Sequence, residues 1–359
     1  MWLIVNAGSS SLKLAVFDQS RELGRASVTE IGTAGHVAAL DRALGEVGVP
    51  LSRLQAAAHR VVHGGTALTR TCRVTPDVLH LIKACVPLAP LHNPANLAGI
   101  QAVARLLPDL PQFATFDTAF HATNPEVAVT YALPQGERAR GLRRYGFHGT
   151  SYAALVRVLA QRGDRPERLL ACHLGNGASL CAIVNGCSLA TTMGYSPLDG
   201  LTMGTRAGSI DGNAVLRLAE LHGVEAAGRI LNRESGLLGL GGASDLRALH
   251  GSDRPEARFA LAHFAYWAVR HAGSMVAAMG GLDAVVFTGG IGENDAWIRA
   301  EILKGLAYLG VVADPVANRL HADRLDDATS RVAIWTVPAD EERQIALEAQ
   351  AVMAGEGAG

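Results

Sequence analysis

Residues 5–18 read VNAGSSSLKLAVFD, and in this stretch one glycine and three serines separate two apolar runs. Two interpretations fit. Gly8 and Ser9 suit the tight turn of a β-hairpin, which needs two to five conformationally permissive residues. The same hydroxyls and bare backbone N–H groups suit an anion, and Lys13 adds a positive charge, so a phosphate loop fits as well. The stretch alone leaves both open.

The composition restricts the class of protein. A chain of 359 residues is long for one hydrophobic core, which predicts two domains. Its 49% hydrophobic and 18% charged residues are typical of a compact, soluble protein, and a net charge of −1 gives no field that would favour nucleic acid or an anionic membrane. The first residues lack a basic leader, and the five cysteines show no zinc spacing. We expect a cytoplasmic protein.

Short apolar runs alternate with helical patterns, which favours an α/β fold. We expect three helices. The first begins at Asn93 as N-cap and ends at Pro108, the second spans 257–279 and is buried on all sides, and the third spans 341–353. Residues 124–141 are expected to form a surface excursion. The expected strands are 2–5, 12–17, 56–62, 113–116, 169–172, 180–184, 284–288 and 332–337.

A faint internal echo links two parts of the chain. GSSSLKLAV and GNGASLCAIV both end in Ser-Leu-x-x-x-Val, and each follows a short apolar strand. The echo is either chance or the trace of two related halves. A third glycine turn, FTGGIGEN at 287–294, lacks the G-x-G-x-x-G spacing of a dinucleotide site. Three such turns, each after a strand, indicate a nucleotide held from two lobes.

Several charged residues stand in unusual settings. Arg60 lies inside an apolar strand, His148 lies between glycines, and Arg206 lies late in a glycine-rich loop. A structural arginine paired with a carboxylate is one interpretation, and a site for an anionic substrate is the other. Asp117 follows a strand directly, which suits a catalytic or metal-directed carboxylate or a helix N-cap. His59 and His63 lack the HExxH pattern, so a zinc site is disfavoured.

Taken together, the motifs resemble the acetate kinase family, in the acetokinase branch of the fold shared by actin, hexokinase and the heat-shock chaperone ATPases. The resemblance implies two duplicated ribonuclease H-like lobes around a nucleotide cleft. The first lobe would comprise 1–121 plus 342–359, completed by the C-terminal helix, and the nucleotide-binding lobe 122–341. The motifs occur in the family's order: NAGSSSLK, HRVVHGG, PLAPLHNP, FDTAFH, YGFHGTS, HLGNGAS, MGYSPLDGLTMGTR, SGLLGL, FTGGIGEN and ADEERQIA.

The resemblance also implies an activity. It is the reversible, Mg²⁺-dependent phosphorylation of acetate by ATP, giving ADP and acetyl phosphate, with Mn²⁺ as a substitute metal. The enzyme would be a transferase of acetyl-CoA biosynthesis and a cytoplasmic homodimer without nucleic-acid or membrane partners. The alternatives are a propionate or butyrate kinase of the same family and a non-catalytic nucleotide-binding protein with the ATPase fold.

Site residues carried over from the family fall into four groups. The catalytic group is Asp117, His148 and Arg206, and the metal group is Asn6 and Glu341. Arg60 would bind the carboxylate of the substrate, with an acyl pocket of Val62, Leu91, Phe147 and Pro197. The nucleotide would contact Lys13, His173, Leu174, Gly175, Asn176, Gly177, Asp245, Leu246, Arg247, Gly289, Gly290, Ile291, Gly292 and Glu293.

Overall fold

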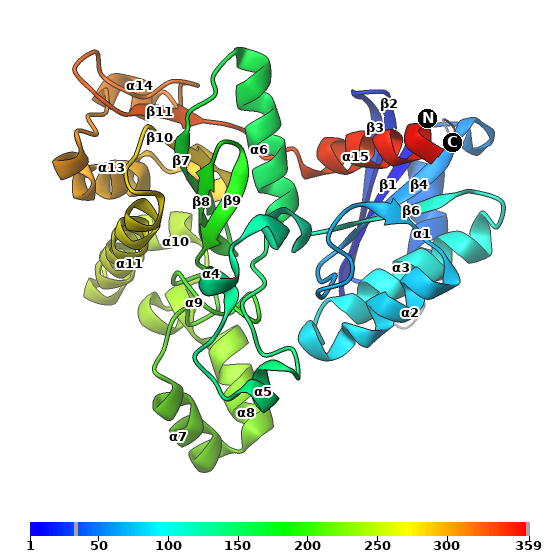
Figure 1. Cartoon of the computed structure of the whole chain (residues 1–359), viewed down its shortest axis with the longest axis horizontal. Coiled ribbons are helices and arrows are strands. Elements are labelled where there is room, and N and C mark those ends of the chain that lie inside the picture. Colours follow the sequence, from blue (N-terminus) through cyan, green and yellow to red (C-terminus); the bar gives the residue numbers. More distant parts are fainter. Residues whose placement is uncertain (32–34, 357–359) are drawn as a thin grey trace. The chain divides into compact units, whose positions relative to one another are not determined.

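The chain forms two compact units, each built on its own β-sheet (Figure 1). The computed structural model describes residues 1–31 and 35–356, so the last three residues of the domain predicted to end at 359 lie outside the described residues. Unit 1 comprises Met1–Ala122, Phe147–Ala154 and the segment from Asp340 onward, and unit 2 comprises Thr123–Gly146 and Leu155–Ala339. The domain limits at 121/122 and 341/342 stay a prediction.

The sheet of unit 1 has six strands in the order β3-β2-β1-β4-β6-β5. Strands β1, β4 and β6 are parallel, whereas β2, β3 and β5 run antiparallel to their neighbours. The strands are β1 (Trp2–Ala7), β2 (Ser11–Asp18), β3 (Arg21–Thr29), β4 (Ala56–Val61), β5 (Cys72–Arg73) and β6 (Gln112–Phe116). The predicted strand 56–62 is therefore one residue too long, because the N–H of Val62 donates to a side chain, Asn96, instead of to a neighbouring strand.

The opening stretch folds as a β-hairpin. Ala7 pairs with Leu12 across the turn, and the N–H of Gly8 donates to the carbonyl of Ser11 at 2.8 Å. The hairpin interpretation is thus confirmed. It does not exclude the phosphate loop, since a turn of this kind still presents hydroxyls and backbone N–H groups, and the phosphate loop stays a prediction.

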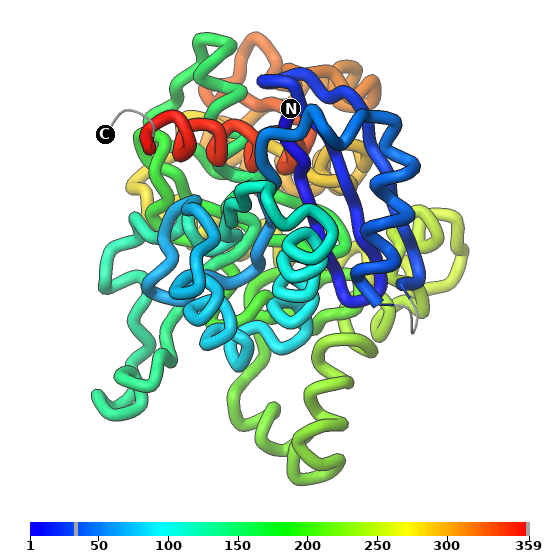
Figure 2. The backbone as a smooth tube through the Cα atoms, turned by 90° about the vertical axis from the view of Figure 1, so that its right-hand side faces the viewer, coloured from blue at the N-terminus to red at the C-terminus, as the bar shows by residue number. Residues whose placement is uncertain are grey.

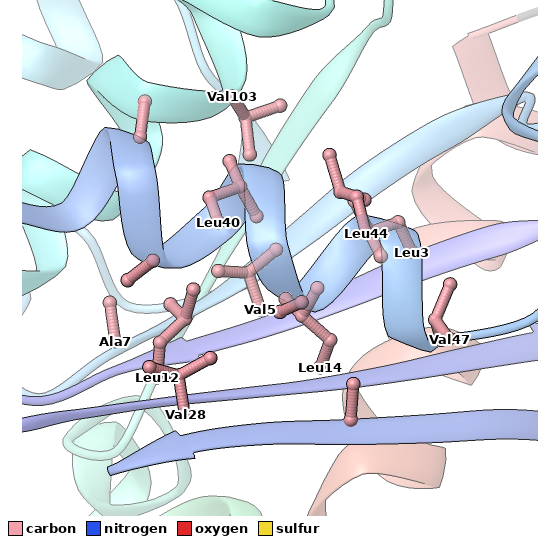
Figure 3. Close-up of a cluster of buried hydrophobic side chains, with 14 of the residues drawn as sticks. Leu3, Val5, Ala7, Leu12, Leu14, Val28, Leu40, Leu44, Val47 and Val103 are labelled. Carbon is pink, nitrogen blue, oxygen red and sulfur yellow. The ribbon is translucent and has the colours of Figure 1, made fainter. Parts of the chain in front are cut away.

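Both faces of the unit 1 sheet are covered. Because successive side chains of a strand point to opposite faces, Leu3 and Val5 face helices α1 (Gly35–Glu46) and α3 (Asn93–Leu106), as Figure 3 shows. Trp2 and Ile4 face the opposite way. They pack against α15 (Glu341–Glu356), whose residues Ile345, Ala346 and Ala349 are buried, and Figure 2 shows this C-terminal helix in red beside the blue N-terminal strands.

The sheet of unit 2 repeats this design. Its order is β9-β8-β7-β10-β11, with β7, β10 and β11 parallel and β8 and β9 antiparallel, which matches β3-β2-β1-β4-β6 strand for strand. The Ser-Leu-x-x-x-Val echo falls on the equivalent strands β2 and β8, so two related ribonuclease H-like halves are confirmed. The strands are β7 (Arg168–Leu174), β8 (Ala178–Val184), β9 (Cys187–Thr191), β10 (Ala284–Thr288) and β11 (Ala333–Thr336).

Helices account for most of the remaining chain. No helix among the residues that the structure describes is long and apolar enough to cross a membrane. The remaining α-helices are α2 (Pro76–Ala84), α4 (Glu126–Val129), α5 (Gln135–Arg138), α6 (Gly149–Arg162), α7 (Gly212–His222), α8 (Val224–Arg229), α9 (Gly236–Gly241), α10 (Leu246–His250), α11 (Pro255–Met279), α12 (Gly289–Asn294), α13 (Ala296–Gly305) and α14 (Pro315–Arg319).

Two expectations about helices were wrong. The N-cap of α3 is His92, and Asn93 is the first helical residue, because its side chain is used elsewhere, on the segment that follows β4. Helix α11 is not buried all round. Phe259 is 58% exposed and Tyr266 is 63% exposed, since the helix packs on the sheet through another side that carries Phe264 and Ala268.

Three buried histidines of unit 1 predict a steep loss of stability in acid. Burial lowers the pKa of His59, His63 and His121 to about 4, although the hydrogen bond from His59 to Gln112 partly opposes the shift. The unfolded chain has ordinary histidine pKa values near 6.5. As the pH falls below 6.5, protons therefore bind the unfolded state first, and each histidine destabilises the fold until the pH reaches about 4.

We expect His59→Gln to make the fall in unfolding free energy between pH 7 and pH 5 shallower by about 2 kcal/mol. Glutamine keeps a polar partner for Gln112 and removes the titrating ring. Urea unfolding at both pH values measures the effect, and His80→Gln on the exposed surface is the control. A variant with the pH dependence of the wild type would contradict this account.

Candidate active site

Three polar residues stand at the carboxyl ends of the parallel strands of unit 1. Arg60 is near the end of β4, and Asp117 directly follows β6, with its N–H bonded to the carbonyl of Val61 at 3.0 Å. Asn6 follows Val5, which pairs with His59, so Asn6 and Arg60 occupy corresponding positions. The carboxyl ends of parallel strands are the usual place for functional residues in α/β folds.

Arg60 and Asp117 form a two-pronged ion pair. Nε of Arg60 donates to Oδ1 of Asp117 at 2.9 Å, and Nη2 donates to Oδ2 at 2.7 Å. The Asp117 carboxylate is almost fully buried, and the hydroxyl of Thr150 lies 3.5 Å from its Oδ1. Such a fork fixes both the position and the plane of the guanidinium. The interpretation of Arg60 as an arginine paired with a carboxylate is therefore confirmed, and its role as a site for an anionic substrate stays a prediction.

Glu341, the first residue of α15, brings a second carboxylate to this group. Its Oε2 lies 3.6 Å from Nε of Arg60. Burial raises the pKa of Glu341 above its ordinary value, and the neighbouring Asp117 adds to the rise, whereas Arg60 and Lys13 oppose it. Burial alone would lower the pKa of Arg60, but the two carboxylates raise it. One guanidinium thus serves the buried carboxylate of Asp117 and the partly buried one of Glu341, an arrangement with room for further positive charge.

The donor set fits a hard divalent cation. Mg²⁺ prefers oxygen ligands and keeps several waters, so one or two carboxylates and the phosphates of a substrate suffice to hold it. Glu341 offers a carboxylate with a raised pKa, and Asn6 offers an amide oxygen. Within residues 1–31 and 35–356, no three or more His, Cys, Asp or Glu side chains form a ready-made metal cluster. Glu341 and Asn6 are therefore the candidate oxygen donors for such an ion.

The segment around His148 is tied to Asp117. The N–H of Gly149 donates to the carbonyl of Asp117 at 2.8 Å, and a Cβ at this glycine would lie 2.3 Å from that oxygen. His148 has φ of 60°, an unusual backbone conformation for a residue other than glycine, which is often found at functional sites. The close approach explains why glycine follows His148 in YGFHGTS, and it brings the backbone next to His148 against Asp117.

Members of the predicted acyl pocket differ in their surroundings. Val62 and Phe147 are buried in unit 1, and the ring of Phe147 lies edge-on to His63 with centroids 5.5 Å apart. Leu91, also in unit 1, is 46% exposed. Pro197 belongs to unit 2, where its carbonyl accepts a 2.5 Å hydrogen bond from Arg206.

Arg206 itself stands in a tightly built loop. Burial lowers the pKa of its guanidinium from the ordinary value. Gly236 of SGLLGL lies against this loop, and a Cβ there would come within 2.7 Å of the Arg206 carbonyl. The N–H of Ser235 donates to the carbonyl of Thr205. The SGLLGL motif therefore supports the loop that carries Arg206, which explains why a distant apolar segment accompanies it.

Two glycine turns of unit 2 lie side by side. β7 and β10 are parallel, with His173 paired to Thr288, so the turn at Gly175 and the start of α12 leave the same edge of the sheet. Gly289 has φ of 79°, and a Cβ there would lie 2.7 Å from the carbonyl of Leu174. The bare backbone of both turns is thereby brought together, as a phosphate-binding site requires.

Not every predicted nucleotide residue can contact a ligand through its side chain. Leu174 and Leu246 are buried, so they can offer only backbone atoms. Asp245 caps α10 and forms an exposed ion pair with Arg247, and hydrogen bonds from Arg247 lower the pKa of Asp245 to about 2. These two side chains lie at the surface of unit 2, and an exposed pair of this kind adds little to stability.

Arg299 is a residue that the sequence analysis missed. Its guanidinium is fully buried and holds the end of α12 through the carbonyls of Gly292 and Glu293, both at 2.8 Å. Its other donors go to Asn318 and His321. Arg299 thus holds the C-terminal end of the glycine-rich helix α12 in place. The signal was present, because an arginine on the apolar side of a helix pattern needs buried polar partners.

Comparisons with known proteins agree with this geometry. The model of the acetokinase family matches residues 36–347. An acetate kinase of Rhodopseudomonas palustris is 42% identical over 382 residues, which cover 96% of each chain. The crystal structure of Porphyromonas gingivalis acetate kinase matches with a TM-score of 0.91 at 34% identity, and a propionate kinase of Francisella tularensis subsp. tularensis with 0.92 at 35%. Both cover 98% of this chain and 99% of the other. This chain belongs to the acetokinase family.

Proposed function

We propose that the chain transfers the γ-phosphoryl group of ATP reversibly to acetate, forming acetyl phosphate. The observation that carries the proposal is the fixed guanidinium of Arg60, held between Asp117 and Glu341 at the strand ends of a chain from this family. An oriented positive charge beside an apolar wall suits a short carboxylate, since one end of acetate needs a cation and the other a methyl-sized pocket.

Arg60 is the residue we assign to the substrate carboxylate. Asp117 takes the hydrogen bonds from Nε and Nη2, which leaves Nη1 to meet the substrate. Carboxylates are already nucleophilic at neutral pH, so the reaction needs no strong base. Asp117 therefore orients Arg60 and adds negative charge toward the metal. Val62 and Phe147 would bound the methyl group of acetate, together with Leu91 and Pro197.

Phosphoryl transfer depends on positioning and on charge neutralisation at the oxygens of the moving group. We assign His148 and Arg206 to that neutralisation. The nucleotide would bind the turns His173–Gly177 and Gly289–Glu293 with Lys13, and Asp245, Leu246 and Arg247 would flank the adenosine.

Asn6 and Glu341 would hold Mg²⁺. The ion, when bound, offsets the charge that develops on the phosphate oxygens. The chain's own contribution is to keep Glu341 at the start of α15, beside Arg60 and within electrostatic reach of Lys13. Mn²⁺ accepts similar oxygen ligands, so we expect it to substitute.

Propionate is the second candidate acceptor, because one matching structure is that of a propionate kinase. We favour acetate because the branched side chain of Val62 leaves less space than a smaller residue would. One methylene in an apolar pocket is worth about 1–3 kcal/mol, so the preference for acetate over propionate should be roughly 10–200-fold.

The proposed activity would serve acetyl-CoA biosynthesis in the cytoplasm. A homodimer is also proposed, and the exposed Phe259 and Tyr266 of α11 are residue types found at interfaces.

The proposal is tested by trapping acyl phosphates with hydroxylamine across acetate, propionate and butyrate. We expect the greatest kcat/KM for acetate, a strict need for ATP and for a divalent cation (Mg²⁺ or Mn²⁺), and formation of ATP in the reverse direction from acetyl phosphate and ADP. A preference for butyrate, or no acyl phosphate from any of the three acids, would contradict the assignment.

Arg206→Lys tests the assignment of the phosphoryl group. Lysine keeps the charge but cannot bridge two phosphoryl oxygens, so kcat should fall roughly 100-fold or more while the KM for acetate changes much less. Arg217→Lys, on the exposed side of α7, is the matched control and should behave as the wild type. A near-native kcat in Arg206→Lys would remove Arg206 from the mechanism.

A further inference from the structure

The segment that follows β4 is held almost entirely by side chains. In each of the consecutive residues 62–65, the backbone N–H donates to a side-chain atom instead of to a backbone carbonyl. The acceptors, in chain order, are Asn96 Oδ1 at 3.0 Å, Asn93 Oδ1 at 3.1 Å, Thr118 Oγ1 at 3.2 Å and His63 Nδ1 at 2.9 Å. This segment contains Val62, so the position of the proposed acyl wall depends on these acceptors.

Asn93 and Asn96 supply two of the acceptors from one side of α3. They are three residues apart, so their side chains lie on the same side of the helix, and they are 0% and 3% exposed. The hydrogen bonds of Asn93 go to both backbone groups of His63 and, at 3.4 Å, to the carbonyl of Ile82. Asn93 thus joins the segment after β4 to α3 and to the end of α2.

Asn96 makes a different connection. Its Oδ1 accepts the N–H of Val62, and its Nδ2 donates at 2.8 Å to the carbonyl of Ala7. Ala7 is the last residue of β1 and directly precedes the turn at Gly8. One buried amide therefore joins the wall of the proposed acyl pocket to the base of the predicted phosphate loop.

The packing around Asn96 leaves little freedom. Gly99, one turn further along α3, lies so close to β1 that a Cβ there would be 2.6 Å from the Cβ of Ala7. The helix backbone therefore approaches the strand end directly, and the amide of Asn96 spans a fixed gap. Losing it would leave a buried N–H and a buried carbonyl without partners, and the backbone would shift to satisfy them.

We propose that Asn96 is a positioning residue that fixes the distance between the β1–β2 turn and Val62, and so aligns the phosphate side of the site with the acyl side. This inference rests on the proposed function, since it assigns the two segments to phosphate and acyl binding. Asn93 is the natural control, because it holds the segment after β4 and makes its hydrogen bonds to His63 and Ile82 instead of Ala7.

The test compares Asn96→Ala with Asn93→Ala in the full-length protein. Both variants should raise the KM for acetate. Asn96→Ala should also raise the KM for MgATP, roughly tenfold, because a displacement of about 1 Å is costly in a positioned site. A purely structural role would lower thermal stability and leave both KM values unchanged. That result, or equal KM values for MgATP in the two variants, would overturn the proposal.

Amide hydrogen exchange supplies a readout that does not depend on activity. Asn96→Ala should speed exchange at Val62 and within the turn at residues 8–10, whereas Asn93→Ala should speed it at His63 and leave the turn unchanged. If the chain forms no acyl phosphate, the proposed function fails. The exchange rates at Val62 and in the turn still test whether Asn96 positions these two segments. Asn96→Asp replaces the alanine variant if the latter does not fold, because it keeps the acceptor for Val62 and alters the donor to Ala7. Exchange in the turn that matches the wild type would overturn the proposal.

Discussion

The ion pair between Arg60 and Asp117 is the contact on which the arrangement of unit 1 depends. An arginine inside an apolar strand is costly to bury alone, and it is stable there because the carboxylate of Asp117, directly after the next parallel strand, accepts two hydrogen bonds from it. The register of β4 and β6 brings the two together, and the N–H of Gly149 then ties the segment of His148 to the carbonyl of Asp117. Removing either side chain would leave the other charge, largely buried, without its main partner.

Strand alternation explains why the polar residues share one face. Trp2 and Ile4 of β1 pack against α15, so Asn6, two residues on, points to the same side. The same rule applies to Arg60 after Ala58, and Glu341 comes from α15 itself. This face is apolar along most of the sheet and becomes polar at the carboxyl ends of the strands. The opposite face carries α3, from which Asn96 holds the backbone of the same strand ends.

The sequence predicted the features that depend on local patterns. The hairpin, most strands, the α/β class, the duplicated halves and the family were confirmed, because apolar alternation, glycine turns and motif order are all visible along the chain. Features that depend on tertiary contacts were missed or wrong. Asn93 is the first residue of α3 and not its N-cap, because its side chain bonds to the backbone of His63, 30 residues earlier. Arg299 was missed, since its partners on Gly292, Glu293, Asn318 and His321 come together around it only in the fold.

The exposed aromatic residues of α11 show a limit of periodicity. The hydrophobic residues of 257–279 nearly encircle the helix, which predicts burial on all sides. Phe259 and Tyr266 are nevertheless more than half exposed. Periodicity shows which sides of a helix are apolar, but not which of those sides another part of the chain covers. Residue roles at the site are a similar case. The sequence gives no distance between Arg60, Asp117 and Glu341, which the fold brings together as one cluster.

The most direct test of the account is the Mg²⁺ dependence of the rate in Glu341→Gln. Glu348→Gln is the matched control, since Glu348 lies on the same helix and bonds to Thr71. If the cluster of Arg60, Asp117 and Glu341 places the metal, the Mg²⁺ concentration for half-maximal rate should rise roughly tenfold in Glu341→Gln and stay near the wild-type value in Glu348→Gln. An unchanged Mg²⁺ dependence in Glu341→Gln, with only a lower melting temperature, would contradict the account.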